Sequence, residues 1–167
     1  MAETTDTFGA ELIAATRSYM GQPAVRHYEF AGNCLEQASP RCLDDGLGPD
    51  NFDCSGLIIR AFSDIAGKRV DDWPLELRHV RDMWDDAQTE ATAFEPTPME
   101  PGALVVLRRR HPVADTTYVV PGHIGVVTQV FRSGAYYIHA SAHPEGRVAM
   151  SRLMTFSGVY GTIRPTA

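Results

Sequence analysis

The sequence has few cysteines, no long hydrophobic run and no excess of positive charge. Its apolar stretches are all shorter than the roughly 18 residues of a membrane-spanning helix, so we expect no membrane insertion. The net charge of -6 argues against a nucleic-acid-binding surface. The first residues lack the basic start and apolar core of a Sec signal peptide, so they do not read as one.

The cysteines are Cys34, Cys42 and Cys54, an odd number that leaves at least one thiol free. Cys34 and Cys42 lack the close spacing of a zinc-binding pair, and we predict no metal site. Two alternatives stay open for this pair: a disulfide that staples the surrounding loop in an oxidising compartment, which we favour, or two reduced thiols. Cys54 is unpaired in both cases.

The 167 residues have ordinary globular composition, and we predict one domain spanning 1–167. Apolar residues at three- and four-residue steps predict helices from Phe8 to Tyr19 and from Cys54 to Ile65. A third helix is expected to begin at Pro74, a favourable first helical position.

Five short segments rich in β-branched and aromatic residues follow, and they predict strands: ALVVL, HIGVVTQVF, AYYIHAS, RVAMS and VYGTIR. Ser133 and Gly134 form a plausible hairpin turn between the second and third. Helices followed by an antiparallel sheet indicate an α+β fold.

Cys54 lies at the predicted start of the second helix, where free backbone N–H groups and the helix dipole favour a thiolate. We therefore expect a lowered pKa for this thiol, with Asp53 as the helix cap. A cysteine in this position is also compatible with a small buried hydrophobic residue, so it needs a base to indicate catalysis. His123 and His139 lie on neighbouring predicted strands, and together with Cys54 they form a candidate nucleophile, base and orienting group.

The identity of the third residue depends on the register of the hairpin. A tight turn at Ser133 and Gly134 carries His123 past His139 towards His143. A shifted register or a bulge is required to bring His139 opposite His123. We select His139 over His143.

These segments resemble the NlpC-type (NlpC/P-60) cysteine peptidases. FDCSGLI is similar to the family's cysteine motif, PGHIGVV to its histidine strand and YYIHAS to the strand of its third residue. HYEFAG and MEPGALVVL are similar to its tyrosine-bearing segment and its strand-opening Pro-Gly motif. The resemblance spans the chain from about Tyr28 to Ser141, with the motifs in the unpermuted order.

The resemblance implies a papain-like α+β fold in which N-terminal helices pack on a C-terminal antiparallel sheet. It also implies hydrolysis of bacterial peptidoglycan stem peptides, commonly at the bond from γ-D-glutamate to the diamino acid, with no metal or organic cofactor. Cys54 is then the nucleophile, His123 the base and His139 the orienting residue. Tyr28, Asp53 and Ser55 match positions that hold the L-alanine end of the substrate in some members. We expect a monomer.

Three other interpretations are kept. The same thiol chemistry serves an N-acetylmuramoyl-L-alanine amidase or an acyl transferase, and a non-catalytic wall-binding module of a phage or other structure needs no chemistry at all. The biological settings that fit are a secreted effector with an immunity protein as partner, a phage enzyme, or a cytoplasmic recycler of wall fragments. In each of them the chain is made in the cytoplasm and acts on the wall or on its fragments.

Overall fold

The computed structural model describes residues 4–24, 52–69, 72, 74, 77–89, 93–110, 119–142 and 145–166. The predictions made for Tyr28, for the Cys34 and Cys42 pair and for His143 lie outside these residues. In the described part of the chain, no helix combines the length and apolarity needed to cross a bilayer.

The described residues contain three α-helices, all before the first strand: α1 (Thr4–Ser18), α3 (Cys54–Ala66) and α4 (Val80–Gln88). Helix α3 ends at Gly67, which adopts the left-handed conformation at φ 62° and closes the last turn through its backbone N–H. The start of α4 differs from the prediction, because the helix begins at Val80 rather than at Pro74. Arg78, just before it, pairs with Asp53, the residue that caps the start of α3.

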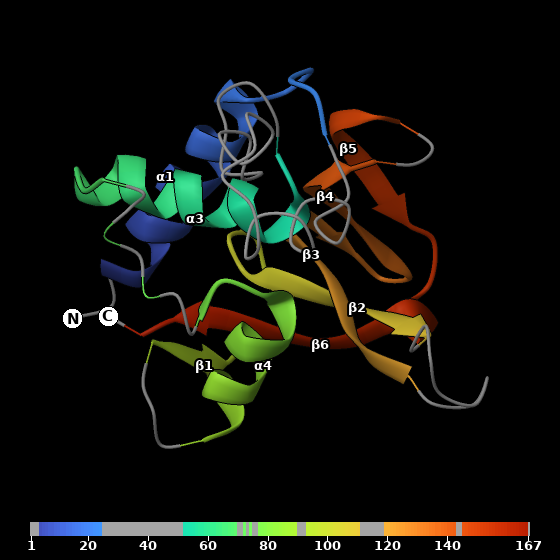
Figure 1. The fold of residues 1–167 in the computed structure, drawn as a ribbon. Helices are drawn as coiled ribbons and strands as arrows, with labels where there is room; N and C mark the ends of the chain where they lie inside the picture. The colour runs from blue at the N-terminus through green and yellow to red at the C-terminus, as the bar shows by residue number, and fades with distance from the viewer. Residues whose placement is uncertain are drawn as a thin grey trace, which may run out of the picture.

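In the part of the chain that the structure describes, six strands form one antiparallel sheet in the order β1-β6-β2-β3-β4-β5. The five predicted strands are confirmed, and a short sixth strand, β1, lies in the proline-containing connector before them. The bounds are β1 (Phe94–Pro96), β2 (Leu104–Arg110), β3 (Val119–Phe131), β4 (Gly134–Ser141), β5 (Arg147–Leu153) and β6 (Val159–Pro165). This arrangement confirms the predicted α+β fold class (Figure 1).

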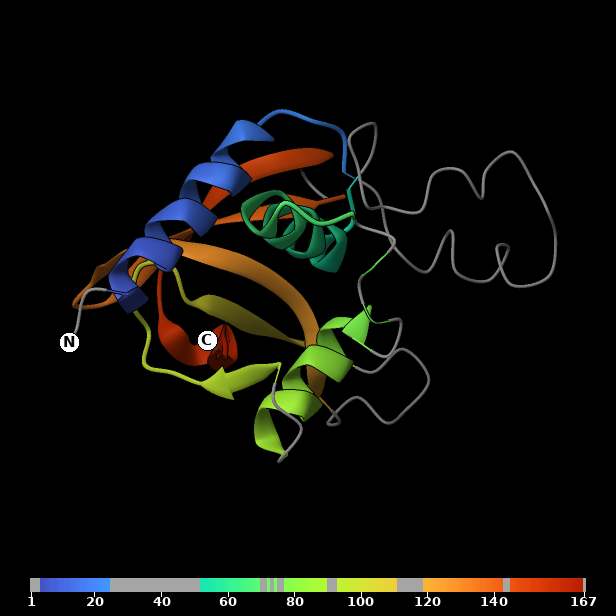
Figure 2. The same cartoon turned by 90° about the vertical axis from the view of Figure 1, so that its left-hand side faces the viewer.

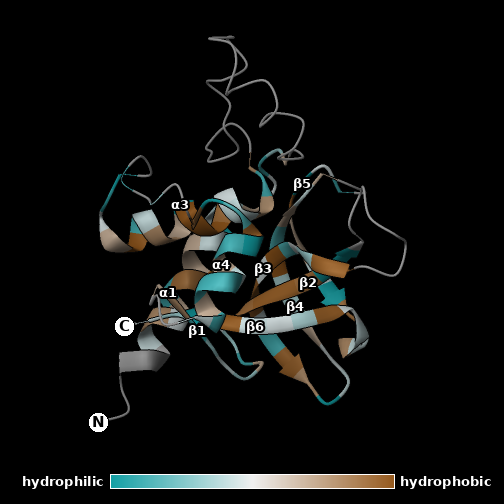
Figure 3. Cartoon of the chain, turned by 60° about the horizontal axis from the view of Figure 1, so that its bottom comes forward, coloured by the Kyte–Doolittle hydropathy of each residue, from teal (hydrophilic) through white to brown (hydrophobic). Residues whose placement is uncertain are grey.

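Helices α1 and α3 lie side by side across one face of the sheet, and α4 lies near β1 and β3 (Figure 2). The main core forms between these helices and the central strands, with side chains such as Leu12, Ile59, Met83 and Ile124 fully buried. Figure 3 shows the hydrophobic stretches of β2 and β3, in contrast to the polar residues along α4. The packing fixes α3 against the middle of the sheet, so the start of α3 is held near β3.

The register of the β3–β4 hairpin is shifted in the direction that the choice of His139 requires. Its loop consists of Arg132 and Ser133, one residue earlier than predicted, because Phe131 pairs with Gly134. A bulge at Thr128 shifts the pairing by one more residue, so that Val126 pairs with Ile138. Both shifts move His139 back towards His123.

Candidate active site

Cys54 is the first residue of α3, and the turn that carries it is capped by a buried carboxylate. Asp53, which is 1% exposed, accepts a hydrogen bond of 2.6 Å from the backbone N–H of Gly56. Asp53 has extended backbone angles and so ends the preceding segment while its side chain completes the first helical turn. The capping role predicted for Asp53 is confirmed.

Cys54 is a partly buried residue, and the helix that it begins packs against β3. The backbone N–H groups of Ile124, the residue after His123, and of Ser55 act on the thiol and favour a lower pKa. Burial and the charge of Asp53 outweigh these contacts and raise the pKa of Cys54 to about 12. The expected lowering of this pKa is therefore wrong for the resting protein, because the thiol is desolvated beside an acidic cap.

The two histidines predicted from the sequence meet in the structure. Nε2 of His123 lies 2.6 Å from Nδ1 of His139, with the rings edge to face at a centroid distance of 4.9 Å. Burial, the neighbouring His139 and Arg109 lower the pKa of His123 to about 3. Burial also lowers the pKa of His139. Cys54 and His123 are thus both uncharged at rest, as thiol and imidazole.

The hydrogen bonding continues beyond the histidines onto β5. Nε2 of His139 lies 2.8 Å from the hydroxyl of Ser151, and that hydroxyl donates over 3.4 Å to Oε1 of Glu145. The sequence analysis did not single out Ser151 or Glu145. Their relation to the histidines depends on the pairing of β4 with β5. This pairing places Tyr137 opposite Ser151, and His139 lies two residues further along β4.

Gly125 leaves the space that the side chains of Tyr137 and His139 occupy. A Cβ atom at position 125 would lie 2.6 Å from the ring of Tyr137 and 3.1 Å from the Cβ of His139. Both side chains therefore cross β3 over a position without a side chain. Glycine is therefore required at position 125 for steric reasons, because any side chain there would collide with Tyr137 and His139.

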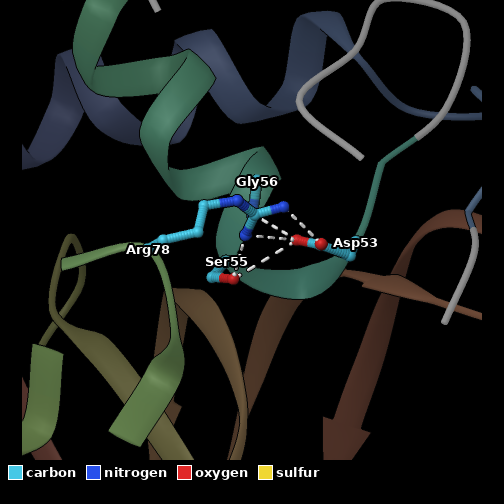
Figure 4. A network of polar contacts seen from close by, with 4 residues as sticks. All are labelled: Asp53, Ser55, Gly56 and Arg78. Atoms are coloured by element: carbon cyan, nitrogen blue, oxygen red, sulfur yellow. Dashed lines mark hydrogen bonds and ion pairs between the residues drawn. The ribbon is translucent and has the colours of Figure 1, made fainter. Parts of the chain in front are cut away.

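Arg78 joins the site from the segment before α4, and sequence reasoning missed it. Its guanidinium pairs with both oxygens of Asp53, at 3.0 Å and 2.5 Å, and also donates to Ser55 Oγ at 2.7 Å (Figure 4). The Arg78 and Asp53 side chains are 12% and 2% exposed. Two of the three residues predicted to hold substrate, Asp53 and Ser55, are thus already engaged by a cation. Nothing in the local sequence pattern connects position 78 with position 53.

The resting protonation of the site has a measurable consequence. A raised thiol pKa means that the thiolate fraction of Cys54 increases only as the pH approaches about 12. We expect the rate of alkylation of Cys54 by iodoacetamide to be low at neutral pH and to rise steadily through the alkaline range. Peptide mass mapping separates this thiol from the other two. A rate that is already constant from about pH 5 to pH 8 would contradict this expectation and indicate a preformed thiolate–imidazolium pair.

In the described residues, no three His, Cys, Asp or Glu side chains are arranged to hold a metal ion. The groups brought together are a thiol, two imidazoles, a hydroxyl and a carboxylate. Such a set supports nucleophilic attack by sulfur with proton transfer to an imidazole.

Comparison with solved structures finds the same architecture in bacterial proteins. An N-acetylmuramoyl-L-alanine amidase from Bacteroides uniformis superposes with a TM-score of 0.57 at 10% identity, over 96% of this chain and 100% of its own. The peptidoglycan hydrolase RipB from Mycobacterium tuberculosis superposes with a TM-score of 0.57 at 20% identity, over all of this chain and 67% of its own. The chain shares their fold. The Resuscitation Promoting Factor Interacting protein RipA, in a mutated form, gives a TM-score of 0.55 at 16% identity.

This likeness establishes an NlpC/P-60-like α+β fold, as the sequence resemblance implied. The superposition with RipA includes 96% of this chain but only 63% of the RipA chain. No protein-family model matches the sequence, and no curated protein sequence matches it.

Proposed function

We propose that the protein is a cysteine peptidase that hydrolyses peptidoglycan stem peptides, with Cys54 as nucleophile, His123 as base and His139 as the orienting residue. The observation that carries the proposal is the 2.6 Å contact between the rings of His123 and His139 on β3 and β4, the two strands on which α3, with Cys54 as its first residue, packs. The shared fold with a peptidoglycan hydrolase and an amidase supports the wall as substrate. The bond we favour is the one from γ-D-glutamate to the diamino acid.

The first half of the reaction forms a thioester. As the sulfur of Cys54 bonds to the scissile carbonyl carbon, its proton passes to Nδ1 of His123, the ring nitrogen not engaged with His139. The carbonyl oxygen becomes an oxyanion, which backbone N–H groups at the start of α3 stabilise, each by roughly 3–4 kcal/mol. The C–N bond then breaks, and the leaving amine takes the proton from His123.

The second half returns the enzyme to its starting state. Water gives a proton to His123 as its oxygen attacks the thioester carbon, and the sulfur leaves with the bonding electrons. The sulfur regains the proton, and the product is released as a carboxylic acid. Because thiol and imidazole are both neutral at rest, each half creates the charges on the pair only while the bond changes occur.

Mass analysis of purified peptidoglycan digested by the protein tests the proposal. Cleavage at the favoured bond leaves a new amino group on the diamino acid, and the mass of the released fragment identifies it. An amidase would instead free the amino group of L-alanine, an outcome that the fold shared with the B. uniformis enzyme makes the second candidate. Acyl transfer would give a new amide without incorporation of ¹⁸O from labelled water. Binding without any new terminus would overturn the enzymatic proposal and favour a wall-binding module.

A further inference from the structure

We propose that Glu145 sets the direction of the hydrogen-bond chain that runs through Ser151, His139 and His123, and so presents His123 to Cys54 with an unprotonated Nδ1. We call these four residues the relay. Glu145 is a positioning residue in this scheme, since it acts through the other three and touches neither substrate nor sulfur. The catalytic consequence rests on the proposed function, whereas the proton positions do not.

The relay ends in a group that only accepts hydrogen bonds. Burial raises the pKa of Glu145, but hydrogen bonds from Ser141 and from its own backbone, together with His139 and Ser151, outweigh burial and lower it. Glu145 is therefore an ionised carboxylate at neutral pH, and each of its contacts requires a donor.

Ser151 has one hydroxyl proton and can therefore donate only one hydrogen bond. When that proton goes to Glu145, the oxygen of Ser151 faces Nε2 of His139 with a lone pair at 2.8 Å. His139 must then carry its proton on Nε2, and its Nδ1 is an acceptor. The carboxylate has fixed the tautomer of a histidine that it does not contact directly.

The tautomer of His139 in turn fixes the tautomer of His123. With Nδ1 of His139 as acceptor at 2.6 Å, Nε2 of His123 must be the donor. A neutral imidazole holds one proton, so Nδ1 of His123 is bare and able to accept a proton. His139 is uncharged and cannot fix this direction by itself, because a neutral histidine pair bonds equally well with both protons reversed.

Without the carboxylate, the reversed relay becomes available. Ser151 donates to His139, His139 donates from Nδ1 to His123, and the proton of His123 lies on Nδ1. In that tautomer the base is blocked, as in other catalytic histidines whose orienting carboxylate is removed. The charged groups that act on the pair from other elements are Arg109 on β2 and, beside Cys54, Asp53 with Arg78. None of them hydrogen-bonds to Ser151 in the described residues.

The test replaces Glu145→Gln, which keeps the size of the side chain but lets it donate as well as accept. We expect kcat/KM on purified peptidoglycan to fall about tenfold to hundredfold, the loss usual when a group that orients a functional histidine is removed. Ser151→Ala should give a similar loss, and the double variant should lose little more than either single one. Glu100→Gln, an exposed carboxylate that accepts from Thr97, is the matched control and should behave as wild type.

A second measurement reads the protons without activity. In ¹⁵N spectra of histidine-labelled protein, His123 and His139 should both carry the proton on Nε2, and Glu145→Gln should move both towards the Nδ1-protonated form. Unchanged ring nitrogens in Glu145→Gln, or a loss of activity no larger than in Glu100→Gln, would overturn the proposal. A wild-type protein that cuts no wall would defeat the proposed function, while the spectra would still decide the direction of the relay.

Discussion

Replacement of Cys54 by alanine is expected to reduce peptidoglycan hydrolysis by about 10⁴-fold or more, because the atom that bonds to the substrate carbon is removed. The release of new amino groups from purified wall measures the rate. The substitution deletes one partly buried sulfur, so the thermal midpoint of unfolding should change by only a few degrees.

A double variant, Cys34→Ser with Cys42→Ser, serves as the control for thiol chemistry and should retain hydrolysis. Undiminished activity of Cys54→Ala would exclude sulfur as the nucleophile. If Cys54→Ala binds wall as the wild type does and the wild type shows no turnover, the protein is a binding module.

The second large effect is expected on stability. Arg78→Ala leaves the carboxylate of Asp53 buried at 2% exposure without its cation, and breaking such a pair costs about 3–5 kcal/mol in the free energy of unfolding. Urea unfolding followed by circular dichroism at pH 7 measures this difference. The same variant should also lose activity, because the turn that carries Cys54 begins at Asp53.

The chain offers a matched control for Arg78. Arg164 forms an ion pair with Glu95 at 2.7 Å, but the two side chains are 38% and 44% exposed, and Arg164→Ala should cost less than about 1 kcal/mol. Adding Asp53→Asn to Arg78→Ala should recover part of the lost stability, since the uncompensated charge is gone. A cost below about 1 kcal/mol for Arg78→Ala would show that the buried pair contributes little.

Local patterns predicted the elements that have strong periodicity and clear end signals. Helix α3 has its apolar face, its cap at Asp53 and its stop at Gly67 within one short segment, and the structure places all three as expected. Strands β2 to β6 were visible from their β-branched and aromatic residues. Cys54, His123 and His139 could be selected because the motifs around them resemble a family.

Features that depend on contacts between distant segments were missed. Pro74 favours a helix start, yet α4 begins at Val80, and Arg78 just before it pairs with the carboxylate that caps α3. The pKa of Cys54 was expected to fall from the helix dipole, but burial and Asp53 raise it. Such burial follows from packing against β3, which no local pattern contains.

The proposed nucleophile and its proposed base belong to parts of the chain that are made at different times and joined only by tertiary packing. A nascent or partly unfolded chain contains Cys54 but has no imidazole beside it, so it carries an ordinary thiol. Chemical competence therefore appears only when α3 docks on the completed hairpin of β3 and β4. With the proposed function, a cell that synthesises this protein is exposed to hydrolysis by it only after folding has finished.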